Sequence, residues 1–273
     1  MHHSIRRIRM FTLVGLLVLL FLLAGCRSLD TQSGRLTQVS LLNALLLGEY
    51  DGFVSVEEVK TMGDTGIGTF DTLDGEMIML DTVVYQAKAD GTVVQASDSM
   101  LVPFAMATHF SPTIDERKVS SLEGIETLKM NMDEVIGATT NDFNRFYAAK
   151  LTGFFKSIRV RSVPAQDKPY QRLSVIAAQQ KEYMYENLEG TIVALRCPPY
   201  VEGINMSGWH LHFLSSDRSK GGHLLEVDIE KALLGIGDMR TYHLILPDSE
   251  SFASLDITHD LSRETQSIEG MRK

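Results

Sequence analysis

The sequence has little cysteine. Only Cys26 and Cys197 occur among its 273 residues. Such a chain cannot rest on a set of disulfides, so its core must be stable without them. The length and the 44% content of hydrophobic residues are enough for one large domain or two small ones.

An excess of positive charge is also missing. The chain has 26 Lys and Arg against 35 Asp and Glu, a formal net charge of −9. Proteins that bind nucleic acid need a basic surface to neutralise phosphates. We therefore expect no nucleic-acid partner. A dinucleotide fingerprint is missing as well, because Gly63, Gly66 and Gly68 lack its order and precede predicted strands, where they are expected at turns.

No apolar run is long enough to span a bilayer comfortably. The longest, "FTLVGLLVLLFLLA", has 14 residues and follows Arg6, Arg7 and Arg9, so residues 1–25 are predicted to be a signal peptide. The run ends in Leu23-Ala24-Gly25-Cys26, which resembles a bacterial lipobox. We therefore expect export, lipidation of Cys26 and a membrane anchor on the extracytoplasmic side of the cell envelope. A plain signal peptide and a signal anchor are the alternatives.

Removal of residues 1–25 would take away three arginines and no acidic residue, which changes the net charge from −9 to −12. Residues 26–38 are polar and aperiodic, and we expect a lipidated N-terminus and tether there. The next segment, "SLLNALLLG", has apolar residues at helical spacing and ends at Gly48. A second short helix is predicted after Ser55, which forms a capping-box pattern with Glu58.

β-branched residues then dominate, and three or four antiparallel strands are predicted over residues 66–97, with turns at Asp74-Gly75 and Asp90-Gly91. A helix capped by Asn141 is predicted over residues 141–155, followed by the strand "KSIRVRSV". A further helix is predicted near residues 173–187. Strands are then predicted at "GTIVALRC", "GWHLHFLSSD", "GGHLLEVDIEKA" and "TYHLILPD".

This order of elements predicts an α+β fold with two sheet-based halves of mixed or antiparallel strands and a few helices. We place an N-terminal α/β half at residues 39–165 and a C-terminal β-rich half at residues 166–273. The second half contains the segment "GWHLHFLSSDRSKGGH". This segment carries three of the eight histidines.

His210 and His212 are two residues apart in a predicted strand and therefore face the same side, while Trp209, Leu211 and Phe213 face the other. A hairpin would bring His223 opposite the pair. Three imidazoles suit Zn²⁺ with an open fourth position, as in catalytic zinc sites. Three histidines also accept iron, cobalt or nickel. The residues alone leave open a strand with two surface histidines and an unrelated third.

Three blocks of the sequence point to a known family. They are "GTFDTLDGEMIMLDTVVYQ", "PFAMATHF" and "GTIVALRCPPYVEGINMSGWHLHFLSSDRSKGGHLLEV", and together they resemble the signature blocks of alpha-acetolactate decarboxylase. The likeness extends from about residue 39 to residue 270. It implies a zinc lyase and a homodimer, with 2-acetolactate converted to (R)-acetoin and CO₂. It also implies that the metal ligands are His210, His212 and His223.

The same resemblance implies four catalytic residues. They are Thr69 and Glu76 in the early hairpin region, Arg161 on the strand after the mid-chain helix, and Glu269 close to the C-terminus. Glu264 is a rival for Glu269, Arg159 for Arg161, and Arg196 is a further candidate for holding a carboxylate. Thr82 departs from the expected pattern, because a glycine is expected after "LD".

The substrate needs no organic cofactor, because its own ketone can accept the electron pair released with CO₂. We expect a metal-stabilised enediolate, a substrate oriented by Arg161, a proton from Glu269 or Glu76, and Thr69 bonded to a carboxylate or water. Two alternatives remain. One is a cupin-like metal isomerase or dioxygenase, which the position of Glu226 disfavours. The other is a non-catalytic zinc-binding lipoprotein.

Overall fold

The computed structural model describes residues 34–268 of the chain. The predicted signal peptide, Cys26 and Glu269 lie outside these residues. Within them, no helix is both long enough and apolar enough to cross a membrane. Cys197, the cysteine in this range, is buried and has a free thiol.

A seven-stranded sheet forms one side of the fold. Its strands pair antiparallel, except that β1 and β14 are parallel. In spatial order it contains β14 (Thr241–Ile245), β1 (Arg35–Val39), β8 (Phe104–Thr108), β3 (Thr65–Thr69), β4 (Glu76–Leu80), β5 (Val83–Ala87) and β6 (Val93–Gln95). A separate two-stranded antiparallel sheet pairs β2 (Val54–Ser55) with β7 (Leu101–Val102).

A five-stranded antiparallel sheet forms the other side. In spatial order it contains β10 (Phe146–Ser162), β11 (Lys181–Cys197), β12 (Gly208–Ser215), β13 (Gly221–Met239) and β9 (Ile114–Glu123). Strand β13 also pairs with β10 along most of its length. The pairing therefore closes a ring of four strands, β10, β11, β12 and β13.

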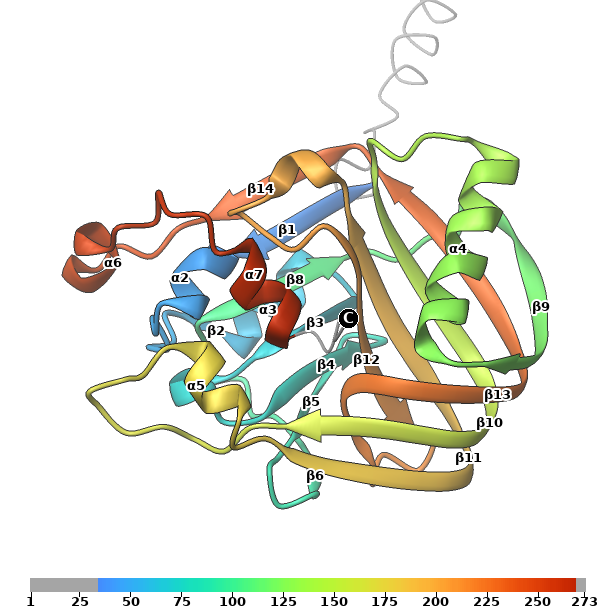
Figure 1. Ribbon diagram of the computed structural model, residues 1–273, viewed down its shortest axis with the longest axis horizontal. Helices are drawn as coiled ribbons and strands as arrows, with labels where there is room; N and C mark the ends of the chain where they lie inside the picture. The colour runs from blue at the N-terminus through green and yellow to red at the C-terminus, as the bar shows by residue number, and fades with distance from the viewer. Residues whose placement is uncertain (1–33, 269–273) are drawn as a thin grey trace, which may run out of the picture. The chain divides into compact units, whose positions relative to one another are not determined.

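The helices within residues 34–268 are short, apart from α4. They are α2 (Leu42–Leu46), α3 (Val56–Met62), α4 (Ile125–Thr139), α5 (Leu173–Ala177), α6 (Glu250–Ser254) and α7 (Ser262–Ile268), with two 3-10 turns at Asp71–Leu73 and Pro199–Val201. In Figure 1, α4 lies against the five-stranded sheet, and α2, α5 and α7 gather on the opposite side of the picture.

Three apolar clusters hold these layers together. One lies between the two sheets and includes Ile78 of β4 and Leu195 of β11. A second packs α4 on the other face of the five-stranded sheet, and a third packs α3 on the outer face of the seven-stranded sheet. Strand β4 therefore has buried side chains on both faces, with Met77 in the outer cluster and Ile78 in the inner one. Because side chains alternate along a strand, Glu76 faces the space between the sheets.

The structure confirms the predicted α+β class and most of the predicted strands. The helix that ends before Gly48 and the capping box of Ser55 and Glu58 are both present. The Asp90-Gly91 turn joins β5 to β6, and the Asp74-Gly75 turn joins β3 to β4 after a 3-10 turn. The histidine strands belong to the C-terminal part of the chain, as predicted.

The helix predicted over residues 141–155 is wrong. This segment is the first part of strand β10, and the long helix α4 precedes it. Asn141 has a φ of 49°, just after the last turn of α4, so it ends a helix rather than beginning one. Asparagine is suited to both positions, since it caps helix N-termini and also tolerates the left-handed conformation after a helix.

Other predicted segments differ in extent. The helix predicted near residues 173–187 covers only α5, and Lys181 already begins β11. Residues 35–38, expected in the tether, belong to strand β1. Strands β9 and β10 precede residue 165 but pair within the sheet of the histidines, whereas β14 returns to the other sheet.

Thr82 lies in the two-residue turn between β4 and β5. Asp81 and Thr82 both have positive φ angles, 52° and 68°. Consecutive residues with positive φ are typical of type I′ hairpin turns, in which glycine is favoured at the second position. The turn thus explains why a glycine is expected there, and it shows that Thr82 is held in a conformation that β-branched residues rarely adopt.

Candidate metal centre and active site

Two adjacent strands bring the three histidines together. His210 and His212 lie on β12, and His212 is directly opposite His223 on β13. Trp209, Leu211 and Phe213 face the α4 side, as the alternation predicts. The histidines therefore face the space between the two sheets. Gly222 has a φ of 147°, and a side chain there would meet the Arg161 carbonyl at 2.6 Å, so this glycine lets β13 approach β10 beside His223.

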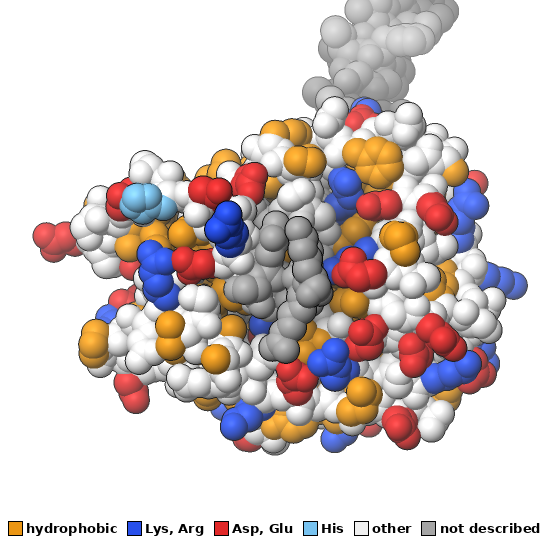
Figure 2. Space-filling view, in the orientation of Figure 1, with side chains coloured by type: hydrophobic (Ala, Val, Ile, Leu, Met, Phe, Trp, Pro, Cys, Tyr) orange, Lys and Arg blue, Asp and Glu red, His pale blue; other side chains and the backbone are white. Residues whose placement is uncertain are grey.

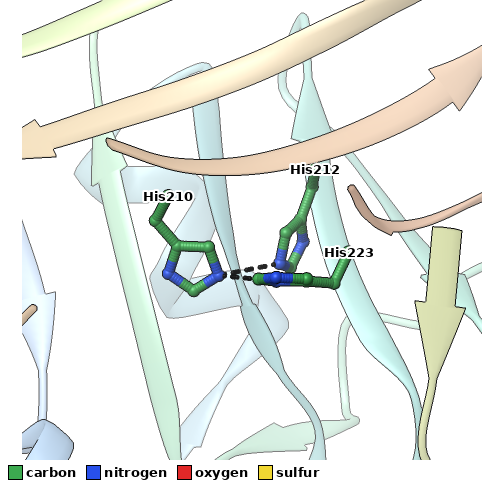
Figure 3. Close-up of side chains that lie close together, drawn as sticks. All are labelled: His210, His212 and His223. Atoms are coloured by element: carbon green, nitrogen blue, oxygen red, sulfur yellow. Dashed lines mark hydrogen bonds between the residues drawn. The ribbon is translucent and has the colours of Figure 1, made fainter. Parts of the chain in front are cut away.

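The three rings converge on one point (Figure 3). His210 Nε2 lies 3.0 Å from His223 Nδ1 and 3.2 Å from His212 Nε2. One nitrogen of each ring lies within 4.8 Å of the others, so the group can hold a metal ion. His212 and His223 are 1% and 3% exposed, whereas His210 is partly exposed. The group is thus buried on one side and open on another.

A backbone carbonyl of the opposite sheet orients His212. Its Nδ1 donates a hydrogen bond to the carbonyl oxygen of Met77, 2.9 Å away. In a neutral imidazole the proton on Nδ1 leaves a lone pair on Nε2, which is the nitrogen that faces the other two rings. This bond is the kind of outer support that metal-binding histidines have in proteins.

Burial keeps all three histidines neutral. Loss of hydration lowers the pKa of His210 from 6.5 to about 3, and the positive charge of Arg161 adds to the effect. Burial also lowers the pKa of His212 and of His223 well below 6.5. Neutral imidazole is the form that binds a metal ion, so the protein holds these side chains in the ligand form over the physiological pH range.

The donor set fits a divalent ion such as Zn²⁺. Tetrahedral coordination with Zn–N distances of about 2.0–2.1 Å places the ligand nitrogens about 3.3 Å apart. The separations of 3.0 and 3.2 Å from His210 Nε2 are close to that value. Three protein ligands leave one coordination position open for a substrate. His210 and His223 line a cavity from which a substrate could reach that position.

Arg161 lies next to the histidines on the third adjacent strand. It is directly opposite His223 in the pairing of β10 with β13, and it is only 5% exposed. Its Nη1 donates to Gln180 Oε1 at 3.0 Å. Gln180 in turn donates to Glu182, at 2.6 Å. Gln180 is thus part of the support that fixes the direction of this guanidinium.

Arg159 and Arg196, the alternatives to Arg161, do not line the cavity beside the histidines. Arg159 is a surface residue whose Nη1 lies 2.9 Å from Glu182 Oε2. Arg196 faces the α4 side of the sheet, where its Nε donates to Asp133 Oδ1 at 3.0 Å. Among the arginines of the described residues, Arg161 is the one that lines the cavity beside the histidines.

Thr69 and Glu76 approach the histidines from the opposite sheet. They face each other in the pairing of β3 with β4. A carboxylate oxygen of Glu76 lies 3.5 Å from His212 Nε2. The Thr69 hydroxyl is buried and donates to the carbonyl of Gly75 at 2.7 Å, which fixes the turn before Glu76.

A single cavity of about 60 Å³ joins these groups. Thr69, Glu76, Arg161, His210 and His223 line its polar part. The rest of the wall is apolar apart from the backbone at Gly68, and comprises Leu42, Leu45, Leu73, Phe104, Val163, Leu173, Ala177 and Ile268. A small molecule with one polar, charged end and short alkyl groups matches this division of the wall.

Glu264 and Glu269 are the two C-terminal candidates for an acidic group at the site. Glu269 lies outside the described residues. Glu264 is on α7, where its carboxylate accepts from Arg172 Nη1 at 2.5 Å and from Ser174 Oγ at 3.2 Å. Glu264 is therefore engaged with α5 and is not among the described residues that line the cavity.

Neither Gln180 nor the helical wall made by α5 and α7 has a recognisable pattern in the sequence. Gln180 lies in "AAQQKEY", where one glutamine is indistinguishable from the next, and its role depends on β10 and β11 being neighbours. The apolar wall residues are spread over the whole chain. A local pattern could not have grouped them.

The comparisons with known proteins agree with each other. The model of the family described as alpha-acetolactate decarboxylase matches residues 36–259. Alpha-acetolactate decarboxylase of Methanosarcina mazei is 39% identical over 243 residues, which are 88% of this chain and 82% of the relative. That of Brevibacillus brevis is 34% identical over 238 residues, 87% of this chain and 82% of the relative. The crystal structure of alpha-acetolactate decarboxylase from Bacillus subtilis strain 168 superposes with a TM-score of 0.82 at 32% identity, covering 86% of this chain and 99% of that one.

Proposed function

The chain belongs to the alpha-acetolactate decarboxylase family, and we propose that it decarboxylates 2-acetolactate at the three-histidine cavity with Zn²⁺ as its metal and (R)-acetoin as its product. It is a carboxy-lyase. The observation that carries the site assignment is the convergence of His210, His223, Arg161 and Glu76 on one cavity, from three strands of one sheet and one strand of the other.

The reaction sets three requirements for the protein. The carboxylate must be held so that the bond between it and the carbinol carbon can break. The electron pair of that bond passes to the neighbouring ketone, which becomes an enediolate as CO₂ leaves. One proton must then reach the former carboxyl-bearing carbon, which gives acetoin. No electron acceptor is consumed, so no redox cofactor is required.

Arg161 meets the first requirement. Its guanidinium lines the cavity, is almost completely buried and is oriented by Gln180. A charge-assisted hydrogen bond from a buried arginine to a carboxylate is short and directional. We assign Arg161 to the substrate carboxylate.

A divalent ion held by the three histidines would supply Lewis acidity and so stabilise the negative charge that develops on the substrate oxygens. His210, His212 and His223 would hold it, each in the neutral form. Zn²⁺ is preferred because the set consists of three imidazoles with an open position. Iron, cobalt and nickel also accept such a set.

Glu76 is assigned to proton delivery. It lines the cavity from β4, and one of its carboxylate oxygens lies 3.5 Å from His212 Nε2. A carboxylic acid fixed on one side of a planar enediolate delivers its proton to one face, which would set the configuration of acetoin. Glu269 shares this assignment as a proposal from the family resemblance. Thr69 keeps the Glu76 turn in place through its bond to Gly75.

The structure disfavours a cupin-like metal site. Such a site would use a glutamate a few residues after the H-x-H pair in the sequence, and the first glutamate after His212 is Glu226, which follows the third histidine. Its carboxylate instead accepts a hydrogen bond from the backbone N–H of Ile125 at 2.8 Å, at the start of α4. A non-catalytic zinc-binding protein would have no need for a buried arginine and a glutamate in the same cavity.

Export and assembly remain proposals from the sequence. Lipidation of Cys26 in an exported, membrane-anchored protein is supported by the Leu-Ala-Gly-Cys pattern after the apolar run. Incorporation of labelled fatty acid that is abolished in Cys26→Ala tests it. A homodimer is proposed from the family resemblance, and sedimentation of the purified protein tests that.

The test of function is product formation. Purified protein is given racemic 2-acetolactate, and CO₂ and acetoin are measured together, with the acetoin enantiomers separated by chiral chromatography. We expect equal amounts of CO₂ and acetoin and an excess of the (R) form. Metal-bound protein that forms neither product would contradict the proposed function.

A further inference from the structure

Two short helices cover the catalytic cavity, and we infer that the ion pair between Arg172 and Glu264 latches this cover. We define the cover as α5 (Leu173–Ala177) together with α7 (Ser262–Ile268). In this inference Arg172 and Glu264 are positioning residues that control access of the substrate. The inference rests on the proposed function, because the cavity concerned is the one assigned to acetolactate.

Both helices contribute to the cavity wall. Leu173 and Ala177 of α5 and Ile268 of α7 line it. Leu173 and Ile268 are 8% and 6% exposed. Since all three side chains belong to the cover, displacement of α5 or α7 would open the apolar part of the wall to water.

The contact between the two helices is largely polar at its outer edge. Glu264 accepts a hydrogen bond from Arg172 Nη1 at 2.5 Å through one carboxylate oxygen, and from Ser174 Oγ at 3.2 Å through the other. The side chains of Arg172 and Glu264 are 48% and 27% exposed. An ion pair as exposed as this is weak, so thermal motion can break it and substrate can pass.

A second cavity, separate from the catalytic one, borders α7. Leu261, Ser262 and Thr265 line a polar cavity of about 600 Å³, which also reaches Asn43 of α2 and Asn205. α7 therefore separates the small catalytic cavity from a larger solvent-accessible hollow. A seven-residue helix that is packed on α5 and borders open space is a segment of low local stability. Figure 2 shows acidic and basic side chains interspersed over the face that carries these helices.

The same helix α5 is connected to the catalytic arginine. The chain passes from Ala177 to Gln180 in a turn, in which the N–H of Gln180 donates to the Ala177 carbonyl at 3.3 Å. Gln180 Oε1 accepts the hydrogen bond from Arg161. The latch thus acts on two parts of the site, the apolar wall through Leu173 and Ile268 and the guanidinium through Gln180.

The expected change in KM follows from the small interaction energy of an exposed ion pair. We expect Glu264→Gln and Arg172→Gln to raise KM for acetolactate roughly 2- to 5-fold, with a smaller change in kcat. Substrate binding requires the closed cover, and each substitution reduces the closed fraction. Exchange of the latch charges in Arg172→Glu with Glu264→Arg should restore part of the loss, which a purely steric role would not.

The experiment uses the full chain. KM and kcat are measured at low and high salt for the wild type, the two single variants and the charge-exchanged double variant. Amide hydrogen exchange of residues 262–268 is followed in parallel without substrate. The control is Asp98→Asn, which removes the ion pair with Lys60 of α3; neither residue lines the cavity. It should change neither the kinetics nor the exchange of α7.

Faster exchange of α7 in the single variants, with KM values that converge with the wild type at high salt, would support the latch. An active wild type whose Glu264→Gln variant has the same KM and the same α7 exchange would overturn it. A wild type that forms no acetoin would contradict the proposed function instead, and the exchange measurement would still decide whether the latch holds α7 closed.

Discussion

His212 and Met77 belong to different sheets, yet His212 Nδ1 donates a hydrogen bond to the Met77 carbonyl oxygen, with 2.9 Å between the two atoms. The metal centre therefore depends on the packing of the two sheets and not on β12 alone. Glu76, the neighbour of Met77, reaches the histidines from the same strand. One segment of β4 thus orients one of the three converging histidines and supplies a carboxylate.

The first prediction concerns the ligands. His223→Asn removes one of three donors from the metal centre, and we expect loss of stoichiometric metal and a fall in kcat/KM of roughly 100-fold or more. Metal content and acetoin formation are measured on the same sample. The matched control is His243→Asn, because His243 is on the exposed part of β14 and should be replaceable. Full metal content in His223→Asn would exclude His223 as a ligand.

The second prediction concerns the support of Arg161. Gln180→Leu removes the acceptor of the Arg161 Nη1 hydrogen bond, and we expect kcat/KM to fall roughly 10-fold while the metal content stays unchanged. Gln179→Leu changes the exposed neighbouring glutamine and is the control. Wild-type activity in both variants would contradict the role of Gln180 in orienting Arg161.

The third prediction concerns pH. In the metal-free protein, burial lowers the pKa of His210 from 6.5 to about 3. Between these values the unfolded chain binds a proton that the folded chain does not, so the free energy of unfolding is highest above pH 6.5 and falls as the pH drops toward 3. The slope is up to about 1.4 kcal/mol per pH unit for each such histidine.

Chemical denaturation of chelated protein between pH 7.5 and 5 measures this slope, and His210→Asn should reduce it relative to the wild type. Equal slopes in the two proteins would show that His210 titrates in the folded state as it does in the unfolded state.

The fourth prediction concerns the turn at Thr82. Thr82 has a φ of 68°, which costs a residue other than glycine about 1–2 kcal/mol. Part of the gain from glycine is offset by the greater entropy of the unfolded chain. We expect Thr82→Gly to raise the free energy of unfolding by about 0.5–1 kcal/mol with unchanged kcat/KM. Thermal unfolding measures it, and a lower Tm would show that the turn is not strained at this residue.

The sequence predicts the parts of the site that depend on local geometry. Alternation along one strand is enough to place His210 and His212 together and to separate them from Trp209. The two glycines before His223 favour close approach of neighbouring strands, and Gly222 indeed lies against the backbone of β10. The proximity of Arg161 depends on the pairing of β10 with β13, and only the family resemblance points to it.

The wrong prediction of a helix over residues 141–155 has a local cause. Leu128, Met132, Val135 and Ile136 are buried at helical spacing in α4, so the signal for that helix is present before residue 140. The predicted helix is placed after Asn141 because asparagine can stand at either end of a helix. Gln180 and the cover of α5 and α7 could not be predicted, because their roles come from contacts between segments that are far apart in the chain.

The most direct test of the metal centre is removal and return of the metal. Purified protein is treated with a chelator, dialysed and assayed for acetoin formation, and Zn²⁺ is then added up to one equivalent while metal content is measured. We predict that activity is lost with the metal and returns in proportion to bound Zn²⁺, with saturation at one ion per chain. Full activity in protein free of metal would contradict the claim that the three histidines hold the ion on which decarboxylation depends.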